Sequence, residues 1–247
     1  MVGNMILVLD AHYRSEFYFQ PVYLPDGEVL GVELIVNFVG VDAPVRIPTG
    51  LVTPVIKPEQ QLILFSEQIE LLENHQTFFK TQPMVVWVNI SAVIIDAILN
   101  DTELSTRLAQ LPFIEFTINE NFPELNCGNE NARLMAMAQH YPLALANFGA
   151  GIATSKPIFD GVFKRVFFDK SFIHKQIKQH SFESFMFAML AQFSPFCQTL
   201  TINGIDDEAA RQKVLSISGF AMQGSLWPGI APGLLEEWFR PDSASLN

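Results

Sequence analysis

The sequence alternates between strand-like and helix-like segments along most of its length. Short apolar runs of the kind found in buried strands are each followed by a stretch with helical spacing or by a helix-capping residue. Repeated alternation of this kind predicts a mostly parallel sheet covered by helices. Seven or eight such units in 247 residues favour a closed barrel over an open sheet. We therefore predict an α/β fold in which residues 1–247 form one domain with a TIM-like (β/α)8 barrel.

Turn and capping residues divide the chain into these elements. Pro25-Asp26-Gly27 marks a turn before the first strand, Pro58 suits the first turn of a helix, and Ser91 can cap another. Strands are expected at residues 29–38, 84–90, 113–118, 143–148, 165–169, 199–203 and 220–223. Helices are expected at residues 58–80, 131–140, 182–193, 206–215 and 234–239, besides the one that follows Ser91.

The charge balance and the cysteines limit the partners and the compartment. The formal net charge is −11, so the chain repels nucleic-acid phosphates and anionic lipid head groups. The two cysteines, Cys127 and Cys197, form neither a metal-type spacing nor a disulfide framework. No apolar run reaches the roughly 18 residues that a membrane span needs, and the first ten residues lack the features of a signal peptide. These features predict a soluble, cytoplasmic protein that binds neither nucleic acid nor membrane.

Polar residues recur where the predicted strands end. Because the carboxyl ends of barrel strands form the catalytic face of such enzymes, these side chains are candidates for one common site. Only three of them are carboxylates, which leaves the site weakly charged. The alternative is that each polar residue only marks the point where its strand stops. The residues are Asn89, Glu115, Asn147, Asp169, Asn203 and Gln223, with Glu33 inside the first strand.

Several short motifs resemble the EAL domain, the phosphodiesterase that cleaves cyclic di-GMP. Each motif alone is weak, but together they follow the family's order and spacing from about residue 18 to residue 232. The resemblance implies a barrel of the EAL type. The matching stretches are Phe19-Gln20-Pro21-Val22, Gly31-Val32-Glu33-Leu34-Ile35, Val88-Asn89-Ile90-Ser91, Asn147-Phe148-Gly149-Ala150-Gly151, Asp169-Lys170-Ser171-Phe172-Ile173 and Gln223-Gly224.

The family's reaction is metal-assisted hydrolysis of a phosphodiester. Two divalent cations, held chiefly by carboxylates, activate a water molecule and neutralise the charge that develops on the phosphate. The resemblance places five of the family's functional positions on residues that are retained in this chain. Glu33 matches the signature glutamate, Asn89 the asparagine ligand, and Glu115 the first glutamate of a Glu-x-x-Glu pair, while Asp169 and Gln223 match further polar positions.

Other functional positions of the family carry residues that cannot do the same chemistry. Ile118 replaces the second glutamate of the pair, Asn203 replaces a further glutamate, and Ala146 and Asn147 replace the two aspartates that hold both cations. Two cationic groups are also lost, since Phe167 stands where the family has lysine and Asn37 where it has the phosphate-binding arginine. An amide or alkyl group offers a divalent cation far less than a carboxylate does. The sequence therefore predicts no catalytic residue, no metal and no cofactor.

Two other functions remain open at the level of sequence. The chain could sense cyclic di-GMP without cutting it, although the lost cations removed the partners of its two phosphates. It could also be a weak cyclic di-GMP phosphodiesterase.

A barrel that keeps its core but not its site is usually retained for a surface. Within the family, the eroded motifs and several additional stretches resemble a stand-alone, non-catalytic subgroup of enteric bacteria. That resemblance implies a regulator that binds FlhD, a subunit of the flagellar activator FlhDC, and thereby represses motility genes. The faces near Phe78-Phe79 or on the helix at residues 182–193 are candidate partner surfaces, with burial against the barrel as the alternative.

Overall fold

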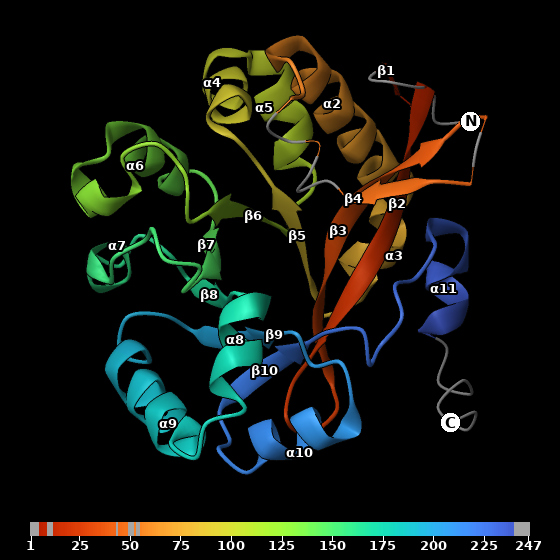
Figure 1. Ribbon diagram of the computed structural model, residues 1–247. Coiled ribbons are helices and arrows are strands. Elements are labelled where there is room, and N and C mark those ends of the chain that lie inside the picture. Colours follow the sequence, from red (N-terminus) through yellow and green to blue (C-terminus); the bar gives the residue numbers. More distant parts are fainter. Residues whose placement is uncertain (1–4, 9–11, 43, 49–51, 53–54, 240–247) are drawn as a thin grey trace.

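Eight strands close into a barrel in the computed structural model, which describes residues 5–8, 12–42, 44–48, 52 and 55–239 (Figure 1). Around the barrel the order is β2, β10, β9, β8, β7, β6, β5, β3 and back to β2. The closed barrel with its covering helices confirms the predicted α/β barrel. The strands are β2 (His12–Tyr23), β3 (Val29–Gly40), β5 (Val85–Asn89), β6 (Ile114–Asn119), β7 (Leu143–Phe148), β8 (Arg165–Phe168), β9 (Thr199–Asn203) and β10 (Phe220–Gln223).

One barrel strand departs from the regular repeat. β2 runs antiparallel to both of its neighbours, β3 and β10, whereas the other barrel strands are parallel to one another. The sequence interpretation missed this strand and began the barrel at residue 29. β2 pairs antiparallel with β3 because a tight turn ending at Gly27, with φ of 91°, joins them. Parallel neighbours would need a much longer connection. The barrel is therefore not a strict (β/α)8 repeat.

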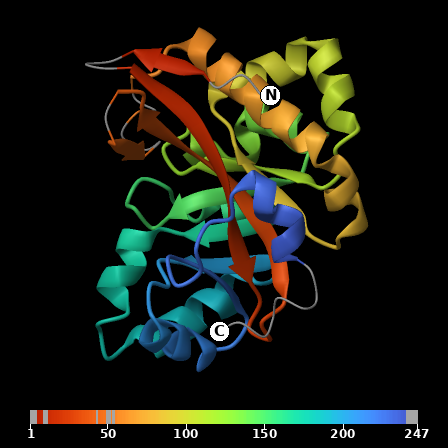
Figure 2. The ribbon, with the colours of Figure 1, turned by 90° about the vertical axis from the view of Figure 1, so that its right-hand side faces the viewer.

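The helices cover the outside of the barrel, and among the described residues none is long and apolar enough to cross a membrane (Figure 1). The predicted helix at residues 58–80 forms two helices, because the helical conformation is interrupted at His75. α11 lies against β2 in both views, where Trp238 contacts Tyr23 (Figure 2). The helices are α2 (Pro58–Asn74), α3 (Gln76–Thr81), α4 (Ala92–Asn100), α5 (Thr102–Ala109), α6 (Ala132–Ala138), α7 (Lys156–Phe159), α8 (Lys170–Gln176), α9 (Phe182–Phe193), α10 (Glu208–Leu215) and α11 (Leu235–Trp238).

Alternate residues along each strand supply two separate apolar layers. The outward-facing set, which includes Val86, Val88 and Ile118, joins the helices in the main core. The inward-facing set fills the barrel with a small cluster around Trp87 and Phe167, whose rings meet edge to face with centroids 5.1 Å apart. Gly31 is required beside this cluster, since a Cβ there would clash with the backbone of Val85 and with the Trp87 ring.

The β2–β3 hairpin extends beyond the barrel as a small antiparallel sheet. Each strand is 12 residues long, and β1 (Ile6–Val8) and β4 (Arg46–Pro48) pair with the two outer edges. A separate apolar cluster that includes Phe38 packs beneath this extension. Buried Ser15 donates a 2.8 Å hydrogen bond to Glu67 of α2, which ties the extension to the helix layer. The extension therefore forms one side of the barrel mouth.

Candidate functional site

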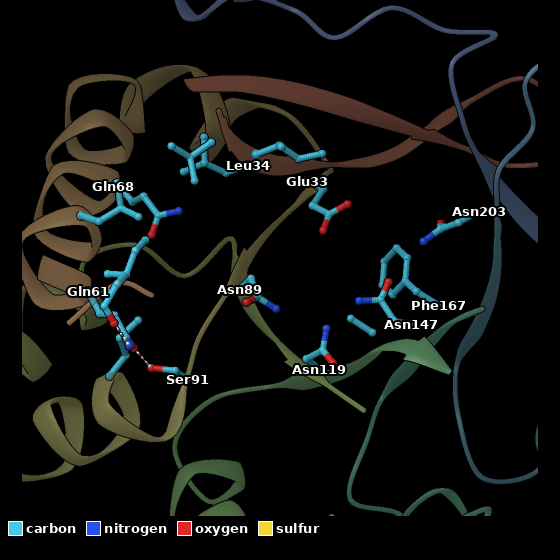
Figure 3. Close-up of a pocket in the computed structure, with 16 residues that line it drawn as sticks. Glu33, Leu34, Gln61, Gln68, Asn89, Ser91, Asn119, Asn147, Phe167 and Asn203 are labelled. Carbon is cyan, nitrogen blue, oxygen red and sulfur yellow. Dashed lines mark hydrogen bonds between the residues drawn. The ribbon is translucent and has the colours of Figure 1, made fainter. Parts of the chain in front are cut away.

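A cavity of about 330 Å³ opens at the carboxyl ends of the parallel strands. Its lining comes from strands β3 and β5 to β9 and from helices α2 and α4, with loop residues between them. Four of the polar residues singled out in the sequence meet there, namely Glu33, Asn89, Asn147 and Asn203 (Figure 3). The expectation that polar strand ends converge on one site is confirmed for these four.

Asparagines dominate the rim of this cavity. The four rim asparagines are Asn89, Asn119, Asn147 and Asn203, and sequence reasoning missed Asn119 because its strand was expected to end at residue 118. Asn89 donates to the Thr117 hydroxyl at 3.2 Å. The Oδ1 atom of Asn203 is buried and has no hydrogen-bond partner. A rim of this kind offers neutral donors and acceptors rather than charge.

Among the described residues, Glu33 is the one acidic side chain that lines the cavity, and its carboxylate points into it (Figure 3). Gln223, the last residue of β10, donates a 3.0 Å hydrogen bond to it. Burial raises the pKa of Glu33 above its ordinary value of 4.5, and the hydrogen bond from Gln223 offsets only part of that effect. The position that resembles the family's signature glutamate therefore holds an isolated carboxyl with a weakened tendency to ionise.

We expect Glu33→Gln to stabilise the fold at neutral pH. When folding raises the pKa of a carboxyl, its contribution to stability is greatest at a pH below the pKa of the unfolded state. That contribution is lost as the pH rises through the pKa of the folded state. The wild type therefore loses stability above about pH 4.5, and the amide removes this loss. Thermal unfolding of both proteins across pH 4 to 8 should show a gap that closes as the pH falls. A gap independent of pH would contradict this account.

Glu115 lies outside the cavity, although the sequence placed it at a strand end. It is the second residue of β6, which continues to Asn119. Its carboxylate accepts hydrogen bonds from Arg165 at 2.9 Å and from the Trp87 indole at 3.0 Å, inside the barrel. Buried Glu115 therefore belongs to an interior ion pair, which is a structural role.

The strand register explains this difference. Asn89 of β5 pairs with Thr117 of β6, two residues beyond Glu115. Two ligands of one cation on adjacent parallel strands are expected at paired positions of the sheet. The β6 residue paired with Asn89 is Thr117. The Glu-x-x-Glu pair of the family then fits Thr117 and Glu120 better than Glu115 and Ile118. Ile118 itself is fully buried and faces the helix layer.

Glu120 holds the loop that follows β7. Its side chain is 2% exposed and accepts hydrogen bonds from the backbone nitrogens of Gly149, at 3.2 Å, and Ile152, at 3.0 Å. This loop begins beside Asn147, whose φ of 60° lies in the left-handed region that asparagine tolerates better than most residues. In the sequence, this role could have been inferred from an acidic residue, Glu120, that directly follows β6.

We expect Glu120→Ala to destabilise the protein by about 2–4 kcal/mol, since it leaves two loop N–H groups without a partner. Asn119 and Asn147 should also become more mobile. Urea unfolding measures the first effect, and amide hydrogen exchange of residues 147–152 measures the second. Glu124→Ala, at an exposed position in the next turn, is the control. Equal costs for the two variants would contradict the assigned role of Glu120.

The remaining predicted positions lie around the cavity or outside it. Asp169 caps α8, accepting a 2.8 Å hydrogen bond from the Phe172 backbone, and is not part of the lining. Asn37 lies farther along β3, where it pairs with Glu16 of β2, and is also outside the lining. Ser91 occupies the N-cap position of α4, but its hydroxyl donates to Gln61 at 2.6 Å rather than to the helix backbone.

The residues at the cavity do not fit a pair of divalent cations. Ala146, Asn147 and Phe167 line it at the positions that resemble two aspartates and a lysine of the family. One carboxylate and several amides are a poor donor set for Mg²⁺ or Mn²⁺. Among the described residues, no group of three or more His, Cys, Asp or Glu side chains is placed to hold a metal ion. The described residues of the lining also include no lysine, arginine or histidine.

Comparison with known sequences gives a consistent set of relatives. The EAL domain family model matches residues 9–228. Anti-FlhC(2)FlhD(4) factor YdiV of Salmonella typhimurium (strain LT2) is 46% identical over 226 residues, covering 92% of this chain and 95% of that protein. The putative anti-FlhC(2)FlhD(4) factor YdiV of Escherichia coli (strain K12) is 42% identical with the same coverage.

Solved structures with the same architecture fall into two groups. The crystal structure of EAL-like domain protein YdiV matches with a TM-score of 0.83 and 40% identity, covering 92% of this chain and 97% of that one. A complex of the PaMucR phosphodiesterase with c-di-GMP matches with a TM-score of 0.70 and 15% identity, covering 90% and 94%. The second likeness establishes the fold alone.

Proposed function

Since this chain belongs to the EAL domain family, we propose that it is a non-catalytic member that acts by binding another protein. The partner is the FlhD subunit of the FlhC2FlhD4 complex, and binding represses the flagellar genes that this activator controls. The names of the relatives support this assignment, because 46% identity over 92% of the chain links it to anti-FlhC(2)FlhD(4) factors.

The composition of the cavity lining is the observation that carries the non-catalytic part of the proposal. One carboxylate with a raised pKa cannot organise two cations, and the aspartate positions hold Ala146 and Asn147. Glu33, Asn89, Asp169 and Gln223 are then remnants of a former site. Glu115 is not such a remnant, because its carboxylate pairs with Arg165 inside the barrel.

Cyclic di-GMP binding is disfavoured by the same lining. The dinucleotide carries two phosphates, and the part of the cavity lining that the structure describes presents no cationic side chain to either of them. Phe167 closes the cavity where the family's lysine would stand, and this ring is 2% exposed. A sensor function would therefore need cations that the lining does not supply.

Direct binding to FlhD tests the proposed function. The full chain should bind FlhD and FlhC2FlhD4 from the same species in isothermal titration calorimetry. It should also lower the affinity of FlhC2FlhD4 for a flagellar promoter fragment, because the inhibitor and the DNA compete for the activator. Absence of binding to both FlhD and the complex would remove the named partner.

The compartment follows from this partner. FlhDC acts on bacterial DNA, so we place this chain in the cytoplasm. Fractionation of the host followed by immunodetection checks this, and recovery in the periplasm would contradict it.

A further inference from the structure

The exposed face of α9 differs from that of an ordinary surface helix. α9 buries Phe182, Met186 and Phe193 against the barrel. Its solvent side, which we call the α9 face, should then carry charged residues. Instead it is formed mostly by Ser184, Phe185, Phe187, Ala188 and Ala191, while Gln192 is its other polar residue and Glu183 its one charged residue. By contrast, α10 exposes Glu208, Gln212 and Lys213.

Two phenylalanines border the α9 face. Phe187 is 62% exposed and Phe185 is 36% exposed, and they flank the buried Met186 on opposite sides of the helix. The small side chains of Ser184, Ala188 and Ala191 lie between them at helical spacing, together with exposed Gln192. The result is a largely apolar strip with two aromatic edges, against which the ridge of another helix can pack.

Of the two surfaces that the sequence left open, only this one is available. Phe79 is 1% exposed and packs against Phe113, with ring centroids 5.0 Å apart. Phe78 is only partly exposed and contacts Phe79 and Phe239. Phe185 and Phe187, in contrast, remain on the surface of α9.

A basic segment adjoins the α9 face. Residues 170–180, which form α8 and the turn into α9, contain three lysines, two histidines and no carboxylate, in a chain of net charge −11. Phe172 of this segment contacts Phe185, with centroids 6.0 Å apart, so α8 and α9 lie side by side. This local excess of positive charge complements an acidic partner.

The charges around this segment leave two lysines available. Lys170 and His174 are held by Asp206 of the loop before α10, at 2.9 Å and 3.1 Å. Glu183 is engaged with Ser216. Within the described part of the chain, the exposed Lys175 and Lys178 form no ion pair.

We propose that the α9 face, together with Lys175 and Lys178, is the docking surface for FlhD and receives an amphipathic helix that carries acidic residues beside its apolar ridge. This inference rests on the proposed function. The apolar strip supplies the buried contact, and the two lysines select an acidic helix and speed its association. Nucleic acid and anionic membranes fit less well, because the rest of the surface is acidic.

Binding of FlhD by surface variants tests this docking surface. Phe187→Asp and the double variant Lys175→Glu/Lys178→Glu should each weaken FlhD binding about tenfold or more, because one charges the apolar strip and the other repels the acidic helix. The affinity of the wild type should fall as ionic strength rises. Calorimetry with FlhD measures both effects, and circular dichroism melts verify that the variants are folded.

Matched controls lie on α2 and α3 or at the N-cap of α2, and both helices lie well away from α9 in both views (Figures 1 and 2). Ile63→Asp changes a 51% exposed residue, and Lys57→Glu/Lys80→Glu reverses two exposed lysines. Both controls should bind FlhD within about twofold of the wild type.

Three outcomes would overturn the docking surface while leaving FlhD as the partner. The first is that all α8 and α9 variants bind FlhD as tightly as the wild type does. The second is a homodimer in sedimentation velocity that Phe187→Asp dissociates without loss of FlhD affinity. The third is binding of duplex DNA or anionic vesicles that depends on Lys175 and Lys178 while FlhD binding does not. Failure of the wild type to bind FlhD would instead reject the proposed function.

Discussion

Replacing Arg165 with methionine should cost about 3–5 kcal/mol of folding free energy, the largest stability effect that we expect for a single substitution. Arg165 lies inside the barrel, where its guanidinium donates to Glu115 at 2.9 Å and to Thr199 at 2.6 Å and lies 5.9 Å from the centre of the Trp87 ring. The side chains of the pair are 11% and 9% exposed. Arg165→Met leaves Glu115 as a buried charge with only the indole N–H as a partner, and urea unfolding measures the cost.

Two further variants separate this cost from a simple loss of packing. Arg165→Met/Glu115→Leu removes both charges, so it should recover much of the lost stability. Arg133→Met breaks an ion pair with Asp96 on the surface, where the N···O distance is 2.8 Å and the side chains are 41% and 50% exposed. That change should cost at most about 1 kcal/mol. If Arg165→Met cost no more than Arg133→Met, the interior pair would not be the constraint described here.

The second large effect concerns chemistry. We expect cyclic di-GMP hydrolysis at least about 10⁴-fold below that of a catalytic EAL domain, because each lost electrostatic group commonly reduces the rate by about 10²–10³. Several such groups are absent at once, at Ala146, Asn147 and Phe167. Calorimetry with Mn²⁺ should accordingly show no saturable binding at micromolar metal. A turnover assay at high protein concentration with Mn²⁺ measures the rate.

Restoring carboxylates provides the control for this prediction. Ala146→Asp/Asn147→Asp adds two acids to the cavity that Glu33 and Asn89 also line, so it should produce measurable Mn²⁺ binding even without turnover. Metal-dependent, linear product formation by the wild type would contradict the non-catalytic assignment. Equal Mn²⁺ binding by wild type and variant would show that another group holds the metal.

The parts of the fold that the sequence predicted best are those with local signals. The strands at Leu143–Phe148, Thr199–Asn203 and Phe220–Gln223 and the helix at Phe182–Phe193 have the predicted bounds. Apolar runs bounded by turn residues define such elements without reference to the rest of the chain. β2 was missed because an antiparallel strand inside a parallel barrel breaks the alternation on which the prediction relied. The break at His75 was missed because the apolar spacing continues across it.

The candidate site was predicted in part. The sequence correctly brought Glu33, Asn89, Asn147 and Asn203 together, since strand ends of one barrel converge. It misplaced Glu115. A motif match does not fix strand register, and a shift of two residues leaves every side chain on the same face of the sheet, so the pattern looks unchanged. Only the pairing of Asn89 with Thr117 fixes that register.

The sequence by itself determined the barrel, the family and the loss of carboxylates, because these depend on residue types and their order. Tertiary structure alone decided which groups share an environment. It paired Glu115 with Arg165 and placed Glu120 where its carboxylate binds the loop that follows β7. It also left Phe187 exposed to solvent while burying Phe79. The physical reason is that burial and pairing arise between residues that are distant along the chain. A sequence shows that a side chain is acidic or aromatic, but only packing decides what it contacts.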